Sequence, residues 1–358
     1  MNLKSVLYRL LICALTVFLC ACSFSPSDVD VSTATIPSTN TGPSPVITSS
    51  LPSRPPKETD LGSLMVSFGG TADSDSIGNF ISYTGRELCY PLYMESEGAV
   101  QTHGVGVLLF LDGRVQPYRL EGEETYTYLH IFHPESTGTT VDLYLTPITG
   151  QPGDTLEFYV YAMPQPDYLP SMGPATMMSY TSGAIGTVMR VQFQASPPDA
   201  VFPEKSLRLT TPEISYVDVS TADVKDWSET DLRERVANRF YLNGQAKHTI
   251  SCLYGASADS PLDLCLEVWG SPYIEHGVVF FVDNEPVFGP DGETLFLTIQ
   301  SGQKTVVNTK LDMSDFSGES VVYAVLVPRN YKTSEISTRA FVDGTENWFV
   351  LSKEKPNS

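Results

Sequence analysis

Residues 103–113 read HGVGVLLFLDG, and residues 276–284 read HGVVFFVDN. Each stretch is an apolar run of strand-forming residues that starts after His-Gly and ends at Asp followed by Gly or Asn. Asp, Asn and Gly tolerate the positive φ angles that tight turns between strands require. Both stretches therefore predict a β-strand that leads directly into a turn.

Other short features recur in the same order in both halves, about 170 residues apart. The chain therefore predicts a tandem duplication, and two unrelated β domains with similar turns are the alternative. The further matches are Glu87-Leu88-Cys89 with Asp263-Leu264-Cys265, Gly153-Asp154 with Gly318-Glu319, and Pro164 and Tyr168 with Pro328 and Tyr331.

Short apolar runs separated by Gly, Asp, Asn and Pro continue along the chain from about Asp60. A repeat of this length is too long for a solenoid and fits two tandem Ig-like β-sandwiches, so we predict an all-β fold. The predicted strands are Gly104–Asp112, Tyr126–His133, Leu156–Met163, Thr187–Ala195, Leu262–Trp269, Gly277–Asp283, Thr294–Gln300, Thr305–Leu311 and Ser320–Val327.

One short helix is expected in the second half. Ser228-Glu229-Thr230-Asp231 resembles a capping box, in which side chains satisfy the first backbone N–H groups of a helix. Leu232, Val236 and Phe240 then recur every four residues, which is typical of one helical face.

The composition limits the classes of partner. Asp and Glu number 42 against 22 Lys and Arg, which gives a net charge of −20. This balance argues against nucleic-acid binding and against electrostatic docking on anionic lipid, because both reward basic surfaces. With 41% hydrophobic residues the chain has enough apolar side chains for a substantial core.

The N-terminal residues form a targeting segment. Lys4 and Arg9 precede an apolar run, Leu10–Leu19, that is too short to span a hydrocarbon layer of ~30 Å. The segment ends in Leu19-Cys20-Ala21-Cys22, which resembles the lipobox of bacterial lipoproteins, although Cys20 replaces the usual Ala, Ser or Thr. The resemblance implies cleavage before Cys22 and a diacylglycerol on its thiol, with palmitate among its acyl chains. An ordinary secretory signal is the alternative.

A polar tether follows the targeting segment. Of the 37 residues from Ser23 to Thr59, 22 are Ser, Thr or Pro, so the stretch cannot bury enough surface to fold. The predicted organisation is signal peptide 1–21, disordered tether 22–59, first sandwich 60–198 and second sandwich 199–358, with the break at Ser196-Pro197-Pro198-Asp199.

Three cysteines remain in the body: Cys89, Cys252 and Cys265. An odd number does not form a closed set of disulfides. Cys252 and Cys265 are candidates for a cross-strand disulfide, and export would permit one. Alternatively, Cys89 and Cys265 are buried residues of equivalent core strands. We expect the cysteines to be reduced.

The sequence contains no catalytic motif such as a G-x-S-x-G nucleophile elbow. His130 and His133 are three residues apart, and in a strand such side chains point to opposite faces. Four acidic residues around one loop, Asp283, Glu285, Asp291 and Glu293, lack the order of a calcium-binding EF-hand. We therefore expect no catalytic residues, no metal site and no cofactor apart from the lipid on Cys22.

Methionines and tyrosines are concentrated between residues 161 and 180. Flexible thioethers and amphipathic rings suit an adaptable contact surface, so this segment is the predicted partner-binding loop. The alternative is a hydrophobic linker that packs one domain against the other. The candidate residues are Tyr161, Met163, Tyr168, Met172, Met177, Met178 and Tyr180.

Together these features predict a bacterial lipoprotein on the extracytoplasmic face of the cell membrane, in the cell envelope. We expect a non-catalytic binding module whose partners are the membrane, through its lipid, and an unidentified protein or glycan. The alternatives are a surface-anchored hydrolase, for example on glycans, whose carboxylate pair meets only in three dimensions, and a structural spacer in an envelope assembly.

Overall fold

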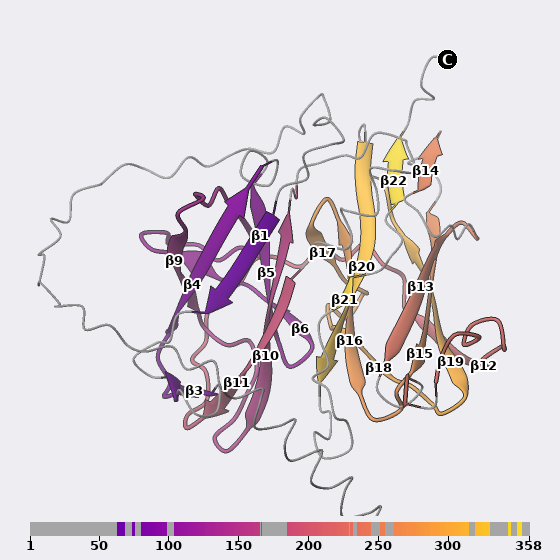
Figure 1. Ribbon diagram of the computed structural model, residues 1–358, viewed down its shortest axis with the longest axis horizontal. Coiled ribbons are helices and arrows are strands. Elements are labelled where there is room, and N and C mark those ends of the chain that lie inside the picture. The colour runs from indigo at the N-terminus through magenta and orange to yellow at the C-terminus, as the bar shows by residue number, and fades with distance from the viewer. Residues whose placement is uncertain are drawn as a thin grey trace, which may run out of the picture. The chain divides into compact units, whose positions relative to one another are not determined.

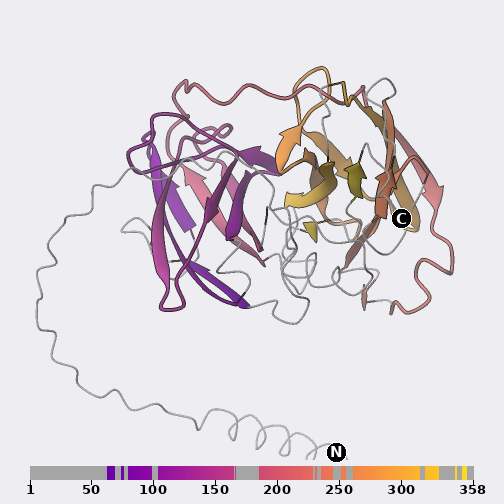
Figure 2. The same cartoon turned by 90° about the horizontal axis from the view of Figure 1, so that it is seen from above.

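The computed structural model is an all-β protein with two β-sandwiches (Figures 1 and 2). No helix of the described residues is both long enough and apolar enough to cross a membrane. The structure describes residues 63–68, 74–75, 80–98, 104–164, 166, 185–228, 230–231, 235–244, 251–254, 261–314, 319–329, 343–344 and 349–352.

The first sandwich pairs a smaller sheet with a larger one. The smaller sheet has the order β1-β4-β9-β7, and the larger one β2-β3-β11-β10-β5-β6, with β8 also paired to β5. These strands are β1 (Ser63–Phe68), β2 (Ser74–Asp75), β3 (Phe80–Tyr83), β4 (Leu88–Glu97), β5 (Val105–Leu111), β6 (Arg114–Gln116), β7 (Arg119–Leu120), β8 (Leu129–Phe132), β9 (Thr139–Leu145), β10 (Thr155–Pro164) and β11 (Ile185–Phe193).

The second sandwich is built in a similar way. Its smaller sheet has the order β12-β19-β15-β13, and its larger one β14-β22-β20-β16-β17, with β18 paired to β16 and β21 to β20. The strands are β12 (Glu213–Asp218), β13 (Val236–Leu242), β14 (Ser251–Tyr254), β15 (Leu262–Gly270), β16 (Glu275–Val282), β17 (Glu285–Val287), β18 (Leu295–Thr298), β19 (Gln303–Leu311), β20 (Glu319–Arg329), β21 (Asp343–Gly344) and β22 (Phe349–Ser352).

The two larger sheets share one strand order. Each contains a central antiparallel pair, β10–β5 or β20–β16, and one parallel pair, β3–β11 or β14–β22. Tandem duplication remains a prediction from the sequence, with two unrelated β domains as its alternative. Each of the nine strands expected from sequence overlaps an observed strand, with ends that differ by a few residues.

The two hairpin turns form as the sequence predicts. Asp112 and Gly113 have φ angles of 51° and 77°, and Asp283 and Asn284 have 52° and 65°. Each pair of residues joins two antiparallel strands, β5 to β6 and β16 to β17. Positive φ at both central residues is the geometry whose twist matches that of the flanking strands, and it explains Asp, Gly and Asn at these positions.

The helix expected after Ser228 does not extend to Val236 and Phe240 as predicted. Within the described part of that segment only Thr230 and Asp231 are helical, and residues 236–242 form β13. The capping box itself exists, because the Asp231 N–H donates to Ser228 Oγ at 3.1 Å and the Ser228 N–H donates to Asp231 Oδ2 at 2.9 Å. A spacing of four residues fits one face of a strand as well as one face of a helix, and Val236 and Phe240 lie on such a strand face.

Three hydrophobic cores hold the body together. One lies inside each sandwich, and the third is shared between them. The shared core combines side chains of β5 and β10 with side chains of β16 and β20, all from the two larger sheets. These sheets are therefore buried on both faces, which explains why all seven residues of β5 are buried and why the runs of Leu, Val and Phe are uninterrupted.

Candidate functional site

The predicted partner-binding loop begins inside the shared core. Tyr161 and Met163 are only 2% and 1% exposed and pack in that core. Just beyond them, the Pro166 carbonyl accepts a 2.9 Å hydrogen bond from Asn284 Nδ2, across the junction of the sandwiches. Tyr161 and Met163 therefore contact the second sandwich, as the packing alternative expects. The other loop candidates, Tyr168, Met172, Met177, Met178 and Tyr180, lie outside the described residues, as does Cys22.

Charged side chains surround one aromatic ring at the junction of the sandwiches. Two guanidinium groups lie over the ring of Phe296 in β18, with Arg114 Cζ at 4.8 Å and Arg329 Cζ at 4.1 Å from the ring centroid. Arg114 reaches from the first sandwich to Glu293 at 2.7 Å, and Arg329 reaches from the second sandwich to Asp112 at 3.1 Å. Two ion pairs and a cation–π contact thus join the sandwiches in addition to the shared core.

The two equivalent turn aspartates have different partners. Asp283 is bound within its own sandwich, by the Ser320 hydroxyl and the Val321 N–H, both at 2.8 Å. Asp112 is bound by Arg329 of the other sandwich, and burial raises its pKa while Arg329 and Arg114 act to lower it. The turn of the first sandwich is therefore adapted to hold the second, which the sequence motif alone did not indicate.

A charged layer covers the outer face of β13, β15 and β19. Trp269 is 4% exposed because Arg239 and Lys304 lie over its ring, at 5.3 Å and 5.9 Å from the centroid. Lys304 Nζ bridges Glu267 at 3.2 Å and Asp223 at 3.4 Å. Burial acts to raise the pKa of Asp223, but hydrogen bonds from Ser220 and Lys304 outweigh it and hold that pKa below its usual value. Asp223 is thus kept ionised, whereas a general acid needs a raised pKa.

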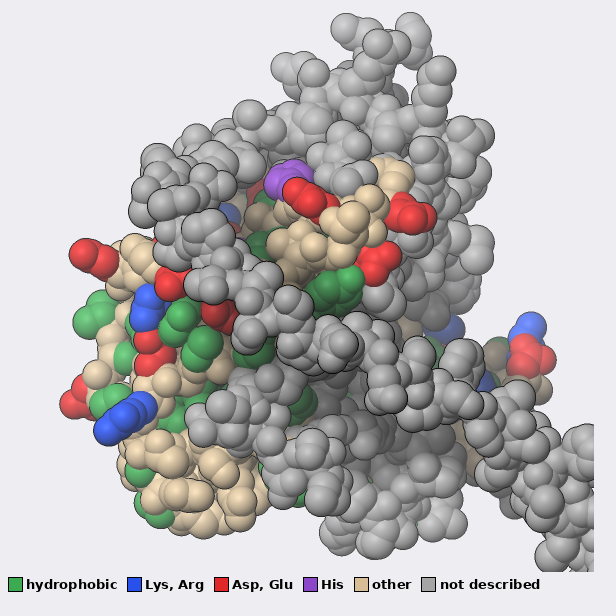
Figure 3. All heavy atoms as spheres, turned by 60° about the vertical axis from the view of Figure 1, so that its left-hand side comes forward, with side chains coloured by type: hydrophobic (Ala, Val, Ile, Leu, Met, Phe, Trp, Pro, Cys, Tyr) green, Lys and Arg blue, Asp and Glu red, His purple; other side chains and the backbone are tan. Residues whose placement is uncertain are grey.

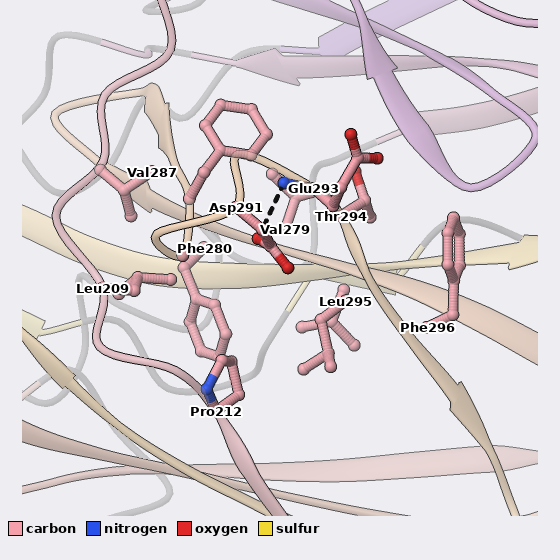
Figure 4. A pocket seen from close by; sticks show the side chains of 13 residues that line it. Leu209, Pro212, Val279, Phe280, Val287, Asp291, Glu293, Thr294, Leu295 and Phe296 are labelled. Atoms are coloured by element: carbon pink, nitrogen blue, oxygen red, sulfur yellow. Dashed lines mark hydrogen bonds between the residues drawn. The ribbon is translucent and has the colours of Figure 1, made fainter.

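One cavity of about 140 Å³ lies in the second sandwich (Figure 4). Apolar side chains such as Leu209, Phe280 and Leu295 line it together with the acidic residues Asp291 and Glu293. Asp291 Oδ1 accepts the Glu293 N–H at 3.0 Å, and the Glu293 carboxylate is paired with Arg114. Pockets for drug-sized ligands measure roughly 300–1,000 Å³, so this cavity is too small for a ligand of that size.

The acidic residues expected around one loop are divided by the fold. Asp283 accepts hydrogen bonds from Ser320 and Val321 in its turn, while Glu293 pairs with Arg114. Within the described residues, no three His, Cys, Asp or Glu side chains are grouped closely enough to hold one metal ion.

His130 packs against neighbouring side chains of the first sandwich. Its ring packs on Tyr118 at 4.6 Å between centroids, and its Nε2 lies 2.9 Å from Thr127 Oγ1. Burial lowers the pKa of His130, although Glu123 opposes this. His130 belongs to β8, whereas His133 follows the end of that strand and is exposed.

His276 gives the body a pH-dependent stability. It is 3% exposed, and burial lowers its pKa to about 4, although a hydrogen bond with the Ile274 backbone opposes this. In the unfolded chain His276 binds its proton at an ordinary pKa of about 6.5. Above that pH its neutral form therefore causes no loss in the free energy of unfolding. As the pH falls from 6.5 toward 4, the unfolded chain binds this proton before the folded chain does, and the free energy of unfolding falls by about 3 kcal/mol.

We expect His276→Leu to remove that part of the pH dependence, as measured by urea unfolding at pH 7 and pH 4.5. The matched control is His133→Gln, because His133 is an exposed histidine of the same chain. An acid-induced loss of stability that is equal in wild type and His276→Leu would contradict this assignment.

The two described body cysteines are free, and both face outward. Cys89 is exposed on β4 and Cys265 is partly exposed on β15, so the expectation that they are buried core residues was wrong. Strand alternation explains this, because the buried residues are their neighbours Leu88 and Leu264. Desolvation raises the pKa of both thiols, that of Cys265 to about 11. Cys265 forms no disulfide with Cys252, whose side chain lies outside the described set.

β12 is the most exposed strand of known side-chain burial. All six of its residues are exposed, and they include Ile214, Tyr216 and Val217 at 43%, 45% and 50%. The strand lies at the edge of the smaller sheet, where β19 is its one partner among the described strands. Sequence analysis did not single out this segment, although three of the four residues between the acids of EISYVD are strand-forming Ile, Tyr and Val.

No family model and no curated protein matches the chain. Among solved structures, it is similar to a putative membrane-anchored protein from Corynebacterium diphtheriae, with 9% identity and a TM-score of 0.22 over 83% of this chain and 60% of that one. It is also similar to the N-terminal Ig1-2 module of the Drosophila receptor protein tyrosine phosphatase DLAR, with 8% identity and a TM-score of 0.19 over 81% of this chain and 98% of that one. The chain thus spans less than two thirds of the first of these structures. Because these identities and TM-scores are low, the function has to be argued from the chain's own residues.

Proposed function

We propose that the protein is a lipid-anchored, extracytoplasmic binding module. The observation that carries this proposal is the sequence Leu19-Cys20-Ala21-Cys22 followed at once by the Ser/Thr/Pro-rich tether of residues 23–59. A diacylglycerol on Cys22 holds the chain at the outer face of the cell membrane. The tether carries the folded body away from the membrane, over a reach of roughly 30–35 Å for a flexible chain of this length.

The body is suited to display rather than to chemistry. The shared core and the pairs Arg114–Glu293 and Arg329–Asp112 resist hinge motion between the sandwiches. Such a body presents its surfaces to a partner in a fixed orientation, which lowers the entropy lost on binding. The carboxylates of its charged layer and of its cavity have cationic or backbone partners. This pairing supports the non-catalytic function.

Two surfaces are candidates for the contact. On the face turned forward in Figure 3, described acidic, basic and apolar side chains are interspersed, without one kind gathering there. The first is the predicted partner-binding loop, which the Met and Tyr content of its sequence still supports. Its remaining candidate residues are Tyr168, Met172, Met177, Met178 and Tyr180. The second candidate is β12.

Cys22→Ala is expected to release the protein from the membrane, because no acyl chain then holds it. Detergent phase separation measures this: the wild type partitions into the detergent-rich phase and the variant into the aqueous phase. The matched control is Cys20→Ala, which removes a neighbouring thiol and restores the usual small residue of a lipobox. Unchanged partitioning of Cys22→Ala would defeat the anchor proposal.

The binding function is tested with the full chain on lipid vesicles, exposed to separate envelope-protein and glycan fractions. The binding function is supported if the vesicle-bound chain retains a component of a fraction and soluble material competes for that binding. Retention no greater than that of bare vesicles contradicts it.

A further inference from the structure

The backbone of β12 offers unused hydrogen-bonding groups. The Val219 N–H donates to the Gly302 carbonyl at 2.9 Å, in register with the pairing of β12 and β19. In an antiparallel ladder, alternate residues bond to the neighbouring strand and the residues between them point away from it. Glu213, Ser215 and Val217 therefore bond to β19. Ile214, Tyr216 and Asp218 direct their N–H and C=O groups to the free edge of the sheet.

This edge lacks the devices that usually prevent strand pairing. Natural proteins protect sheet edges with short strands, proline, lysine or bulges. Among the other edge strands of the described part, β6 and β7 have three and two residues, and β17 has three and contains Pro286. The edge strands β1 and β13 have six and seven residues and also lack proline and lysine, but no residue of β13 is fully exposed. β12 has six residues with neither proline nor lysine, and its three central apolar side chains are more than 40% exposed.

We propose that β12 binds an extended peptide segment by strand addition, and that this segment carries apolar residues between basic ones. This inference rests on the proposed binding function and names its partner class. The main-chain groups of Ile214 and Tyr216 supply the ladder hydrogen bonds, and the side chains of Ile214, Tyr216 and Val217 contact the apolar residues of the peptide. The exposed carboxylates of Glu213 and Asp218 contact its basic residues at the two ends of the strand.

Charge favours a basic peptide over a second copy of the chain as the partner of β12. Two β12 strands that pair along their free edges bring two copies each of the acidic residues Glu213 and Asp218 into one short ladder. Two whole chains also repel each other, because each carries a net charge of −20. A basic peptide is instead attracted by both the ends of the strand and the overall field of the protein.

The test uses the full chain in detergent micelles and a labelled synthetic peptide of sequence Lys-Val-Thr-Val-Thr-Val-Lys, with binding followed by fluorescence anisotropy. The variant is Tyr216→Pro, which removes an N–H that points to the free edge and leaves the bonds to β19 in place. We expect the peptide to bind the wild type and to bind Tyr216→Pro at least ~10-fold more weakly. Far-UV circular dichroism and the melting temperature check that the variant is folded.

Three controls make the result specific. Leu207→Lys changes an exposed apolar residue outside β12 and is expected to keep wild-type binding. Ile214→Lys leaves every backbone bond in place and is expected to weaken binding, which covers the case in which Tyr216→Pro does not fold. The same peptide with Glu in place of both Lys residues is expected to bind at least ~10-fold more weakly than the basic peptide.

Equal binding of the basic peptide to the wild type and to both β12 variants would overturn the inference. So would a dimer of the full chain that Tyr216→Pro dissociates, because the occupant would then be a second copy. If Tyr216→Pro retained the same components of the envelope fractions as the wild type, the binding function would stand and the assignment to β12 would fall.

Discussion

Replacing Gly277 by alanine is expected to lower the free energy of unfolding by about 3 kcal/mol, at the upper end of overpacking effects. Gly277 lies in β16 where the second sandwich meets the hairpin turn of the first. A Cβ at this position would clash with the carbonyl oxygen of Gly113 and would also approach the Gly113 Cα, at 2.9 Å. Backbone atoms of a turn cannot move aside as a flexible side chain does, so the two sandwiches have to separate locally.

The measurement is guanidinium unfolding of the full chain, with Gly289→Ala as the matched control. A Cβ at Gly289 would meet its nearest atoms at 3.5 Å and 3.7 Å, which is ordinary contact distance. Both are glycine-to-alanine changes in the second sandwich, and neither glycine has a positive φ angle. The two variants therefore differ mainly in the approach to Gly113. Equal stability of the two variants would show that the close approach does not constrain the junction.

Replacing Phe281 by alanine is expected to cost about 3–5 kcal/mol and to uncouple the unfolding of the two sandwiches. Phe281 is fully buried in the shared core and stacks on Tyr323, with ring centroids 5.0 Å apart and an interplanar angle of 8°. Its loss leaves a cavity between the two larger sheets, where the contacts that make unfolding cooperative lie. Differential scanning calorimetry should show one transition for the wild type and two for the variant.

Phe280→Ala is the matched control on the same strand. Phe280 is 2% exposed, but it points the other way, into the core of the second sandwich alone. We expect a similar loss of stability with a single transition, because the shared core stays intact. If Phe281→Ala also unfolded in one transition, the shared core would not be what couples the sandwiches.

Much of the local structure could be predicted from the sequence because it depends on near neighbours. The φ angles at Asp112, Gly113, Asp283 and Asn284 follow from residue types that tolerate such angles. The predicted helix does not extend through Val236 and Phe240, because residues spaced by four fit the periodicity of a strand as well as that of a helix. β13 was decided instead by the alternation of buried and half-buried residues across Val236–Leu242 once β15 was beside it.

The candidate site was harder to predict, because its residues are brought together by segments distant in sequence. Phe296, Arg114 and Arg329 come from three separate strands, and no spacing in the sequence joins them. One signal for the shared core was present, since β5 and β16 are apolar at nearly every position. A strand with one face in solvent would alternate apolar and polar residues instead.

The sequence by itself determined the class of fold, the two hairpin turns and the expectation of a lipid anchor at Cys22, because each depends on a short contiguous motif. Only the tertiary structure decided that Tyr161 and Met163 pack against the second sandwich and that, among the described strands, only β19 pairs with β12. Burial of a side chain depends on what the rest of the chain places next to it. An apolar run is therefore the same signal for a core and for a binding surface until the fold covers one and exposes the other.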